Sequence, residues 1–120
     1  LRKALDDLHR KGHRATACAL LLASGRPLPD LAATLASHAL IHTAEGELFR
    51  DAVAYAAGRC EIPILKLKER ELLDHAAVRF GISAAALPHR LTEIGRTLGT
   101  PWRQDEKYAA LAAALALDAA

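Results

Sequence analysis

Apolar residues recur at helical spacing along most of the chain, but two short runs follow a different pattern. Residues 15–23 form a nearly continuous apolar run, with basic residues before it and Ser24-Gly25-Arg26-Pro27 after it. Its brevity and two-sided apolarity favour a buried parallel strand, although a short buried helix would show the same pattern. Residues 62–68 alternate in their second half and place Lys66 and Lys68 on one side. This alternation predicts a second strand, with Pro63 at its start or on an edge.

Amphipathic helices are expected over the rest of the chain. The first carries Leu1, Leu5 and Leu8 and ends near Gly12. The next should run from residue 30 towards residue 42. Another should start at a Thr43 cap and end near residue 58, with a bend at residue 46 between the two. The buried stripe of this third helix would comprise Leu48, Phe49, Ala52, Val53 and Ala56.

Three further helices are predicted in the C-terminal half. They cover residues 69–80, residues 83–99 with a kink at Pro88, and a last segment from residue 108 onwards. The positions expected to face inward on these helices are Leu72, Leu73, Ala76, Phe80, Leu87, Leu91, Ile94, Leu98, Tyr108, Leu111, Leu115 and Leu117.

The order helix, strand, helices, strand and three helices predicts one α/β domain over residues 1–120. A strand–helix–strand crossover implies a parallel pair with a right-handed connection, so we expect a small parallel sheet packed by five to six helices. Two strands are too few for an independently stable sheet. The chain begins with Leu1 rather than Met, so we expect upstream residues or a second copy to supply more strands.

Composition narrows the class of protein. The chain is 52% hydrophobic and 25% charged, which is typical of a folded soluble domain. Sixteen basic and fourteen acidic residues give a formal charge of +2, too mild to indicate nucleic-acid binding by itself. Cys18 and Cys60 each lie among apolar residues and are interpreted as reduced thiols. No run is long enough to cross a membrane and no signal peptide is visible, so a cytoplasmic location is expected.

The stretch 37–47 is the strongest candidate for chemistry, because it holds two imidazoles and two carboxylates. On a continuous helix His38, His42 and Glu45 would share one face, where they could bind a divalent metal or carry a proton. The stretch could equally be a polar junction between two helices, with Glu45 and Glu47 at the positive end of the second. Neither histidine belongs to a named metal motif.

A second candidate site lies where the predicted strands end, since ligands of open parallel sheets bind beyond the carboxyl ends of the strands. Gly25 would let the backbone approach a ligand, and Arg26 could grip an anion with two hydrogen bonds. A plain turn is the alternative for both residues. Trp102 could stack on a base or anchor its loop to the core. Asp105 could cap a helix or serve as one carboxylate of a metal pair.

Two resemblances add to these expectations. The segments SGRPLP (24–29), SHALIHTAEGELFRDA (37–52) and GTPWRQDEK (99–107) resemble a family of uncharacterised small bacterial proteins over most of the chain. More weakly, residues 60–64, 69–72 and 105–117 are similar to the C-terminal half of RNase H-like nucleases of the Holliday-junction resolvase type. That second resemblance implies phosphodiester cleavage by two carboxylate-held metal ions, with Asp105 as the final acid of the family. Tyr108 stands where the family has a further acid, and neither predicted strand carries its leading aspartate.

The leading hypothesis is therefore a dimeric, RNase H-like domain that binds nucleic acid or another phosphate ligand, with metal-dependent hydrolysis by Mg²⁺ or Mn²⁺ as its possible activity. The rival is a non-catalytic interaction protein in which the 37–47 stretch fixes helix packing and the dimer. A third hypothesis is a single metal ion, such as Zn²⁺, on His38, His42 and Glu45. The residues assigned to these roles are the acids Glu45, Glu47 and Asp105, the histidines His38 and His42, and the phosphate contacts Gly25, Arg26 and Lys107.

Overall fold

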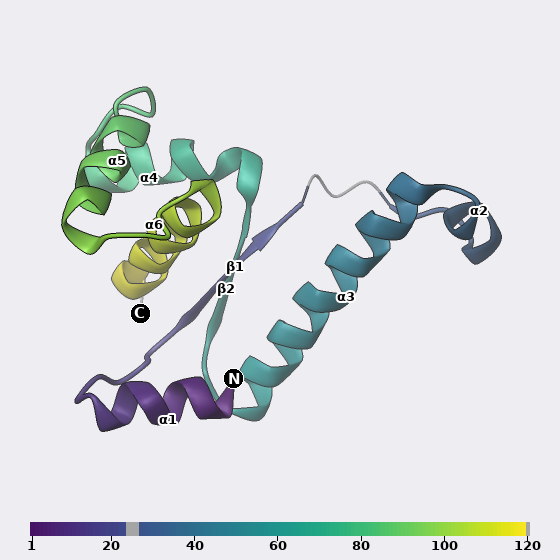
Figure 1. The fold of residues 1–120 in the computed structure, drawn as a ribbon, viewed down its shortest axis with the longest axis horizontal. Coiled ribbons are helices and arrows are strands. Elements are labelled where there is room, and N and C mark those ends of the chain that lie inside the picture. The colour runs from purple at the N-terminus through teal and green to yellow at the C-terminus, as the bar shows by residue number, and fades with distance from the viewer. Residues whose placement is uncertain (24–26, 120) are drawn as a thin grey trace.

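The computed structural model describes residues 1–23 and 27–119 and shows a mixed α/β fold, as the sequence predicts (Figure 1). In chain order the elements are α1 (Arg2–Arg10), β1 (Cys18–Leu22), α2 (Leu31–Leu35), α3 (His38–Arg59), β2 (Ile64–Lys68), the 3₁₀ turn η1 (Glu69–Glu71), α4 (Leu72–Phe80), α5 (Leu87–Leu98) and α6 (Gln104–Ala119). No described helix combines the length and apolarity needed to span a bilayer.

The two strands pair in parallel, with Cys18 opposite Ile64 and Leu22 opposite Lys68. Residues 15–23 therefore contain a strand, and the alternative of a short buried helix is wrong. Pro63 directly precedes β2, and its carbonyl accepts a hydrogen bond of 2.8 Å from the backbone N–H of Cys18. The missing N–H of the proline thus falls outside the ladder, as expected for a proline at a strand start.

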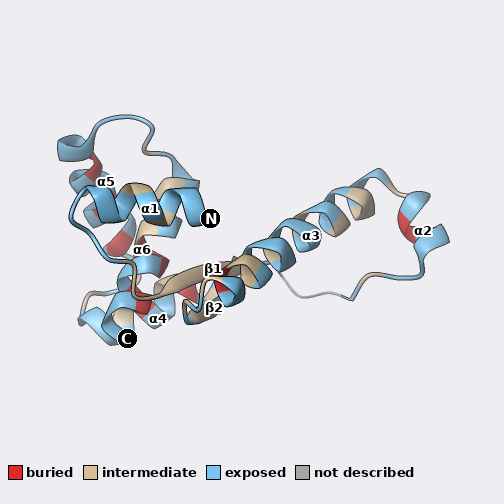
Figure 2. Ribbon diagram, turned by 90° about the horizontal axis from the view of Figure 1, so that it is seen from below, coloured by how far each residue is buried: buried red, intermediate tan, exposed pale blue. Residues whose placement is uncertain are grey.

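The two faces of this small sheet are covered differently. Figures 1 and 2 place α4, α5 and α6 on one side of the strands and α3 on the other. The first side is the core, where the strand residues Ala19, Leu21, Leu65 and Leu67 pack against a buried helical cluster. That cluster comprises Leu72, Ala76, Leu87, Leu91, Leu111, Ala112 and Leu115.

The helix boundary expected at residues 42–43 lies instead at Ser37, and α3 runs unbroken from there. Ser37 has an extended backbone, and its hydroxyl accepts a hydrogen bond of 3.4 Å from the N–H of Leu40. Thr43 is inside the helix, where its hydroxyl donates to the Ala39 carbonyl at 3.1 Å. Gly46 produces no boundary, because one glycine costs a helix only about 1 kcal/mol relative to alanine.

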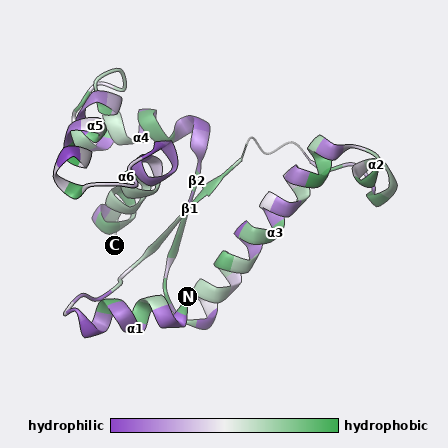
Figure 3. Ribbon diagram, viewed as in Figure 1, coloured by the Kyte–Doolittle hydropathy of each residue, from purple (hydrophilic) through white to green (hydrophobic). Residues whose placement is uncertain are grey.

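Four of the five residues of α3 that the sequence predicts to be buried are exposed, and the fifth, Ala56, is half-buried. Leu48 and Phe49 are 68% and 70% exposed, and Val53 is 40% exposed. The helix meets the sheet through a different side, on which Ala57 is fully buried. Hydrophobic segments recur along the whole length of α3 in Figure 3, so periodicity did not reveal which side meets the sheet.

The C-terminal helices follow the sequence prediction with local corrections. Gly81 ends α4 in the left-handed conformation at φ 65°, a geometry that glycine adopts without steric cost. Pro88 lies in the first turn of α5, where its missing N–H is harmless, so it starts the helix rather than kinking it. The positions predicted to face inward but found exposed are Phe80, Ile94, Leu98 and Leu117.

Candidate functional site

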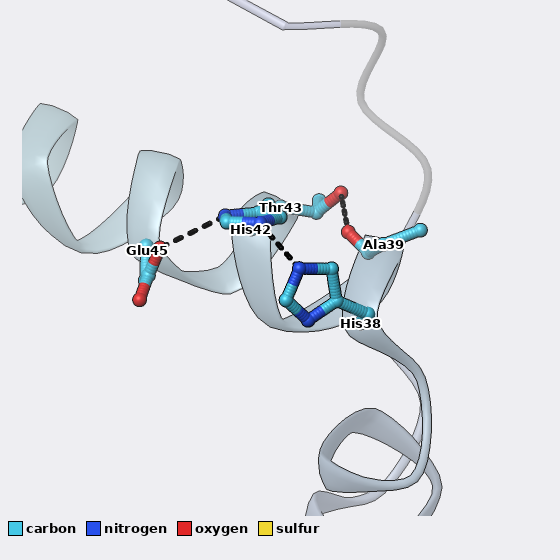
Figure 4. A network of polar contacts seen from close by, with 5 residues as sticks. All are labelled: His38, Ala39, His42, Thr43 and Glu45. Atoms are coloured by element: carbon cyan, nitrogen blue, oxygen red, sulfur yellow. Dashed lines mark hydrogen bonds and ion pairs between the residues drawn. The ribbon is translucent and has the colours of Figure 1, made fainter.

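The first group of candidate residues meets on the exposed, N-terminal part of α3 (Figure 4). The Nε2 atoms of His38 and His42 lie 3.1 Å apart, and the rings meet edge to face with centroids separated by 4.5 Å. On the other side of the His42 ring, Nδ1 lies 3.2 Å from a carboxylate oxygen of Glu45. The His42 and Glu45 side chains are 63% and 57% exposed. The helix therefore brings together the three residues that the spacing predicts.

In this arrangement the two histidines and Glu45 would have different roles at a metal ion. The two Nε2 atoms are joined by an N–H···N hydrogen bond in this structure. One metal ion could take the place of the shared proton, since tetrahedral Zn–N bonds place two nitrogens about 3.3 Å apart. Glu45 lies against the opposite nitrogen of His42, where a carboxylate orients the ring rather than binding the same ion. In the described part of the chain, no group of three or more His, Cys, Asp or Glu side chains is arranged to hold a metal.

The three predicted acids do not gather at one point. Glu45 and Glu47 are two residues apart on one continuous helix, and such positions do not face each other. Asp105 is in the first turn of α6, which lies across the sheet from α3. A two-metal site built from these three carboxylates together is therefore not assembled within residues 1–23 and 27–119.

The carboxyl ends of the strands are flanked by two hollows. The α6 hollow, about 420 Å³ in volume, lies on the core side and is lined by Ala23, Glu69, Arg70, Leu73 and Tyr108. The α3 hollow, about 300 Å³, lies on the other side and is lined by Leu22, Ala23, Glu47, Arg50, Asp51 and Lys66. The two share Ala23, the residue directly after β1. This is the edge at which parallel α/β sheets bind ligands.

The α3 hollow carries two carboxylates and two cations. Glu47 and Asp51 are one turn apart on α3, so their side chains project from the same side of the helix. Arg50 is fixed at the strand, because its Nε donates to the Leu21 carbonyl at 2.9 Å. Lys66 reaches the hollow from β2. Sequence reasoning included Glu47 but missed Arg50 and Asp51, because their role depends on which side of α3 meets the sheet.

The remaining candidates lie near the α6 hollow or outside the described residues. Tyr108 lines this hollow, and Asp105 is three residues before it on the same helix. Lys107 is turned towards α5, where its Nζ donates to the Thr92 hydroxyl at 3.1 Å. Gly25 and Arg26 fall outside the described residues.

Trp102 has a structural position. Its indole Nε1 donates to the Leu91 carbonyl at 2.7 Å, and its ring lies on Gly95 of α5. Of the two roles expected for this residue, the geometry matches the loop anchor.

A larger hollow, about 820 Å³, borders β2 between α4 and the end of α6. Its lining residues are Leu65, Lys66, Leu67, Glu71, Asp74, His75, Val78, Arg79, Leu115, Asp118 and Ala119. It lies beside the strand rather than beyond its carboxyl end. The Arg79 guanidinium within it is already paired with the Asp118 carboxylate. The two smaller hollows are therefore the better candidates for an anionic ligand.

Comparison with protein-family models found no match, and comparisons with curated proteins and with solved structures found none either.

Proposed function

We propose that this chain is an RNase H-like, nuclease-related domain that binds nucleic acid or another phosphate ligand across the carboxyl ends of β1 and β2. The observation that carries the proposal is the pair of charged hollows that share Ala23 at this edge. Ligands of parallel α/β sheets bind outside the carboxyl ends of the strands, where loops and helix starts converge.

The cations of the two hollows would contact the phosphate. Arg50 is held by its Nε, and guanidinium groups bind phosphate through more than one N–H. Lys66 and Arg70 are exposed on the two sides of the same edge. Both can approach a phosphate without first breaking a buried contact.

The acids Glu47 and Asp51 support a metal-assisted form of this binding. Mg²⁺ is commonly bound by one or two carboxylates together with the phosphate groups of a substrate. A pair of carboxylates one turn apart, beside an arginine and a lysine, matches that requirement. In this proposal Mg²⁺ or Mn²⁺ would arrive with the phosphate ligand, and Glu47 and Asp51 would be its protein ligands. The resemblance of residues 60–64, 69–72 and 105–117 to the resolvase-type nucleases also supports a phosphodiester ligand.

Removing a basic side chain from this edge of the sheet should weaken binding of a nucleic acid. We expect Arg70→Ala and Lys66→Ala each to reduce affinity for a fluorescently labelled DNA strand several-fold, and to lower the dependence of log K on log salt by about 1. Fluorescence anisotropy at several salt concentrations measures both quantities. Lys3→Ala is the matched control, since α1 lies beyond the amino ends of the strands (Figure 1). Salt-insensitive binding, or an equal loss in Lys3→Ala, would contradict the proposal.

As a second candidate function, we infer a single-metal site on His38 and His42. The specific observation is the 3.1 Å separation of their Nε2 atoms, close to the separation of two nitrogens on one Zn²⁺. Glu45, on the far nitrogen of His42, would orient that ring and strengthen it as a ligand. Water would complete the coordination of an ion with two protein ligands.

Calorimetric titration of chelator-treated protein with Zn²⁺, Mn²⁺ and Mg²⁺ tests this second function. We expect stoichiometric heat with Zn²⁺, its loss in His42→Ala, and a 10- to 100-fold weaker affinity in Glu45→Ala, about the effect of removing an orienting partner. His75→Ala is the control, because His75 pairs with Glu71 at 3.7 Å on another helix. If wild type gives no heat and His42→Ala unfolds more easily than wild type, the cluster is a structural junction instead.

A further inference from the structure

One side of α3 is apolar and uncovered. Its middle is formed by Leu48, Phe49 and Tyr55, which are 68%, 70% and 71% exposed. Large contiguous patches of exposed apolar surface mark interaction sites on folded proteins. The chain is also extended for its length, with a radius of gyration of 16.3 Å, whereas a compact domain of this size has about 13.6 Å. Both observations indicate that α3 requires a packing partner.

Charges flank this apolar surface symmetrically. Glu45, Ala52 and Arg59 are spaced seven residues apart, so they lie almost in line along the helix. Arg59 is exposed and forms no ion pair within the described part of the chain. We call the surface made by Glu45, Leu48, Phe49, Ala52, Tyr55, Ala56 and Arg59 the outer face of α3. It is acidic at one end, basic at the other and apolar between them.

We infer that two copies of this chain associate through the outer face of α3, as antiparallel helices related by a two-fold axis at Ala52. In this register Glu45 of one copy lies opposite Arg59 of the second, and Phe49 lies opposite Tyr55. A parallel pair would place like charges together at both ends. A two-fold contact uses the same surface on both copies and closes after two subunits.

The side chains suit close packing of two helices. Ala52 at the axis and Ala56 one turn away are small, which allows helix axes to approach to about 8–10 Å. The four aromatic rings alone would remove roughly 400–700 Å² from water. With Leu48 and the charged ends of both copies, this contact approaches the lower limit of specific interfaces, about 1,200 Å². Glu47, Arg50 and Asp51 project from the other side of α3, so the dimer leaves the α3 hollow accessible.

Sedimentation velocity over a range of protein concentrations tests this inference. We expect wild type to dimerise and Phe49→Ser to weaken the dimer by about 30-fold or more, the effect of truncating an aromatic hot-spot residue. Val78→Ser is the control, because Val78 is 88% exposed on α4 and lies outside the outer face. Phe49 is exposed, so its substitution should leave the fold intact, which circular dichroism verifies. A wild type that stays monomeric at all concentrations would overturn the inference.

Charge reversal and cross-linking test the antiparallel register. Glu45→Arg and Arg59→Glu should each weaken the dimer, and the double variant should restore it, since every copy then carries the reversed pair. Ala52→Cys should form an intermolecular disulfide on mild oxidation, whereas Val78→Cys should not. Failure of the double variant to recover, or equal cross-linking at both cysteines, would overturn the register. The result is independent of phosphate binding, so it stands or falls apart from that proposal. Arg59→Glu tests the register without changing the contact between His42 and Glu45.

Discussion

Gly95→Ala is expected to destabilise the protein strongly, lowering the free energy of unfolding by about 3 kcal/mol. A Cβ atom at this position would overlap the Cδ1 and Nε1 atoms of the Trp102 ring. The ring would have to move out, losing both its burial against α5 and its hydrogen bond to the Leu91 carbonyl. The backbone of Gly95 is helical, so the cost comes from lost space rather than from conformation. Urea denaturation measures the change.

Gly58→Ala is the matched control for this prediction. Gly58 is also in a helix, but nothing lies within 4 Å of an added Cβ. The higher helix propensity of alanine should leave stability unchanged or raise it by up to about 1 kcal/mol. Similar unfolding midpoints for the two variants would show that Trp102 does not pack on Gly95 as described.

Leu72→Ala should also remove a large part of the stability, about 2–5 kcal/mol. Leu72 has no exposed surface and lies at the start of α4, within the cluster that joins α4, α5 and α6 to the sheet. Its truncation leaves a cavity that the surrounding helices can fill only partly. Since small domains have roughly 5–15 kcal/mol in total, thermal unfolding of this variant should begin at a clearly lower temperature.

Val78→Ala provides the comparison on the same helix. Val78 is 88% exposed, so its truncation should change stability by no more than about 0.5 kcal/mol. If Leu72→Ala and Val78→Ala both lose little stability, the core is not centred on the buried cluster of α4, α5 and α6.

Local sequence signals predicted the elements well where short-range chemistry decides the structure. The apolar run at 15–23 and the alternation at 62–68 both contain strands, and Gly81 ends a helix as expected. The predicted helix start at Thr43 is wrong, and α3 begins after Ser37 instead. Serine and threonine are both favoured N-cap residues, so the sequence does not distinguish the two positions. Only the structure shows the hydroxyl of Thr43 bonded within the helix.

Longer-range features could not be predicted from periodicity. The pattern shows that Leu48, Phe49 and Val53 share a side of a helix, but not that this side lacks a partner within the described chain. For the site, the spacing of His38, His42 and Glu45 was sufficient, because their contacts are local to one helix. The α3 hollow combines residues from α3, β1 and β2, and their juxtaposition depends on the fold.

The two sides of α3 thus have different proposed roles. Arg50 ties the inner side to β1 and places Glu47 and Asp51 at the carboxyl end of the sheet. The outer side carries the histidine cluster and the apolar surface assigned to a second copy. Because α3 is a continuous helix of 22 residues, one side of it can line the α3 hollow while the other side forms the outer face.

The central claim, that phosphate ligands bind at the carboxyl ends of β1 and β2, is tested most directly by NMR. Amide signals would be followed while a short single-stranded oligonucleotide is added in the presence of Mg²⁺. The account predicts that signals from α1 stay in place and that the largest shifts occur at residues lining the two hollows, among them Leu22, Ala23, Arg50, Asp51, Arg70 and Tyr108. Shifts concentrated on α1 or α5, or no shifts at high oligonucleotide concentration, would contradict it.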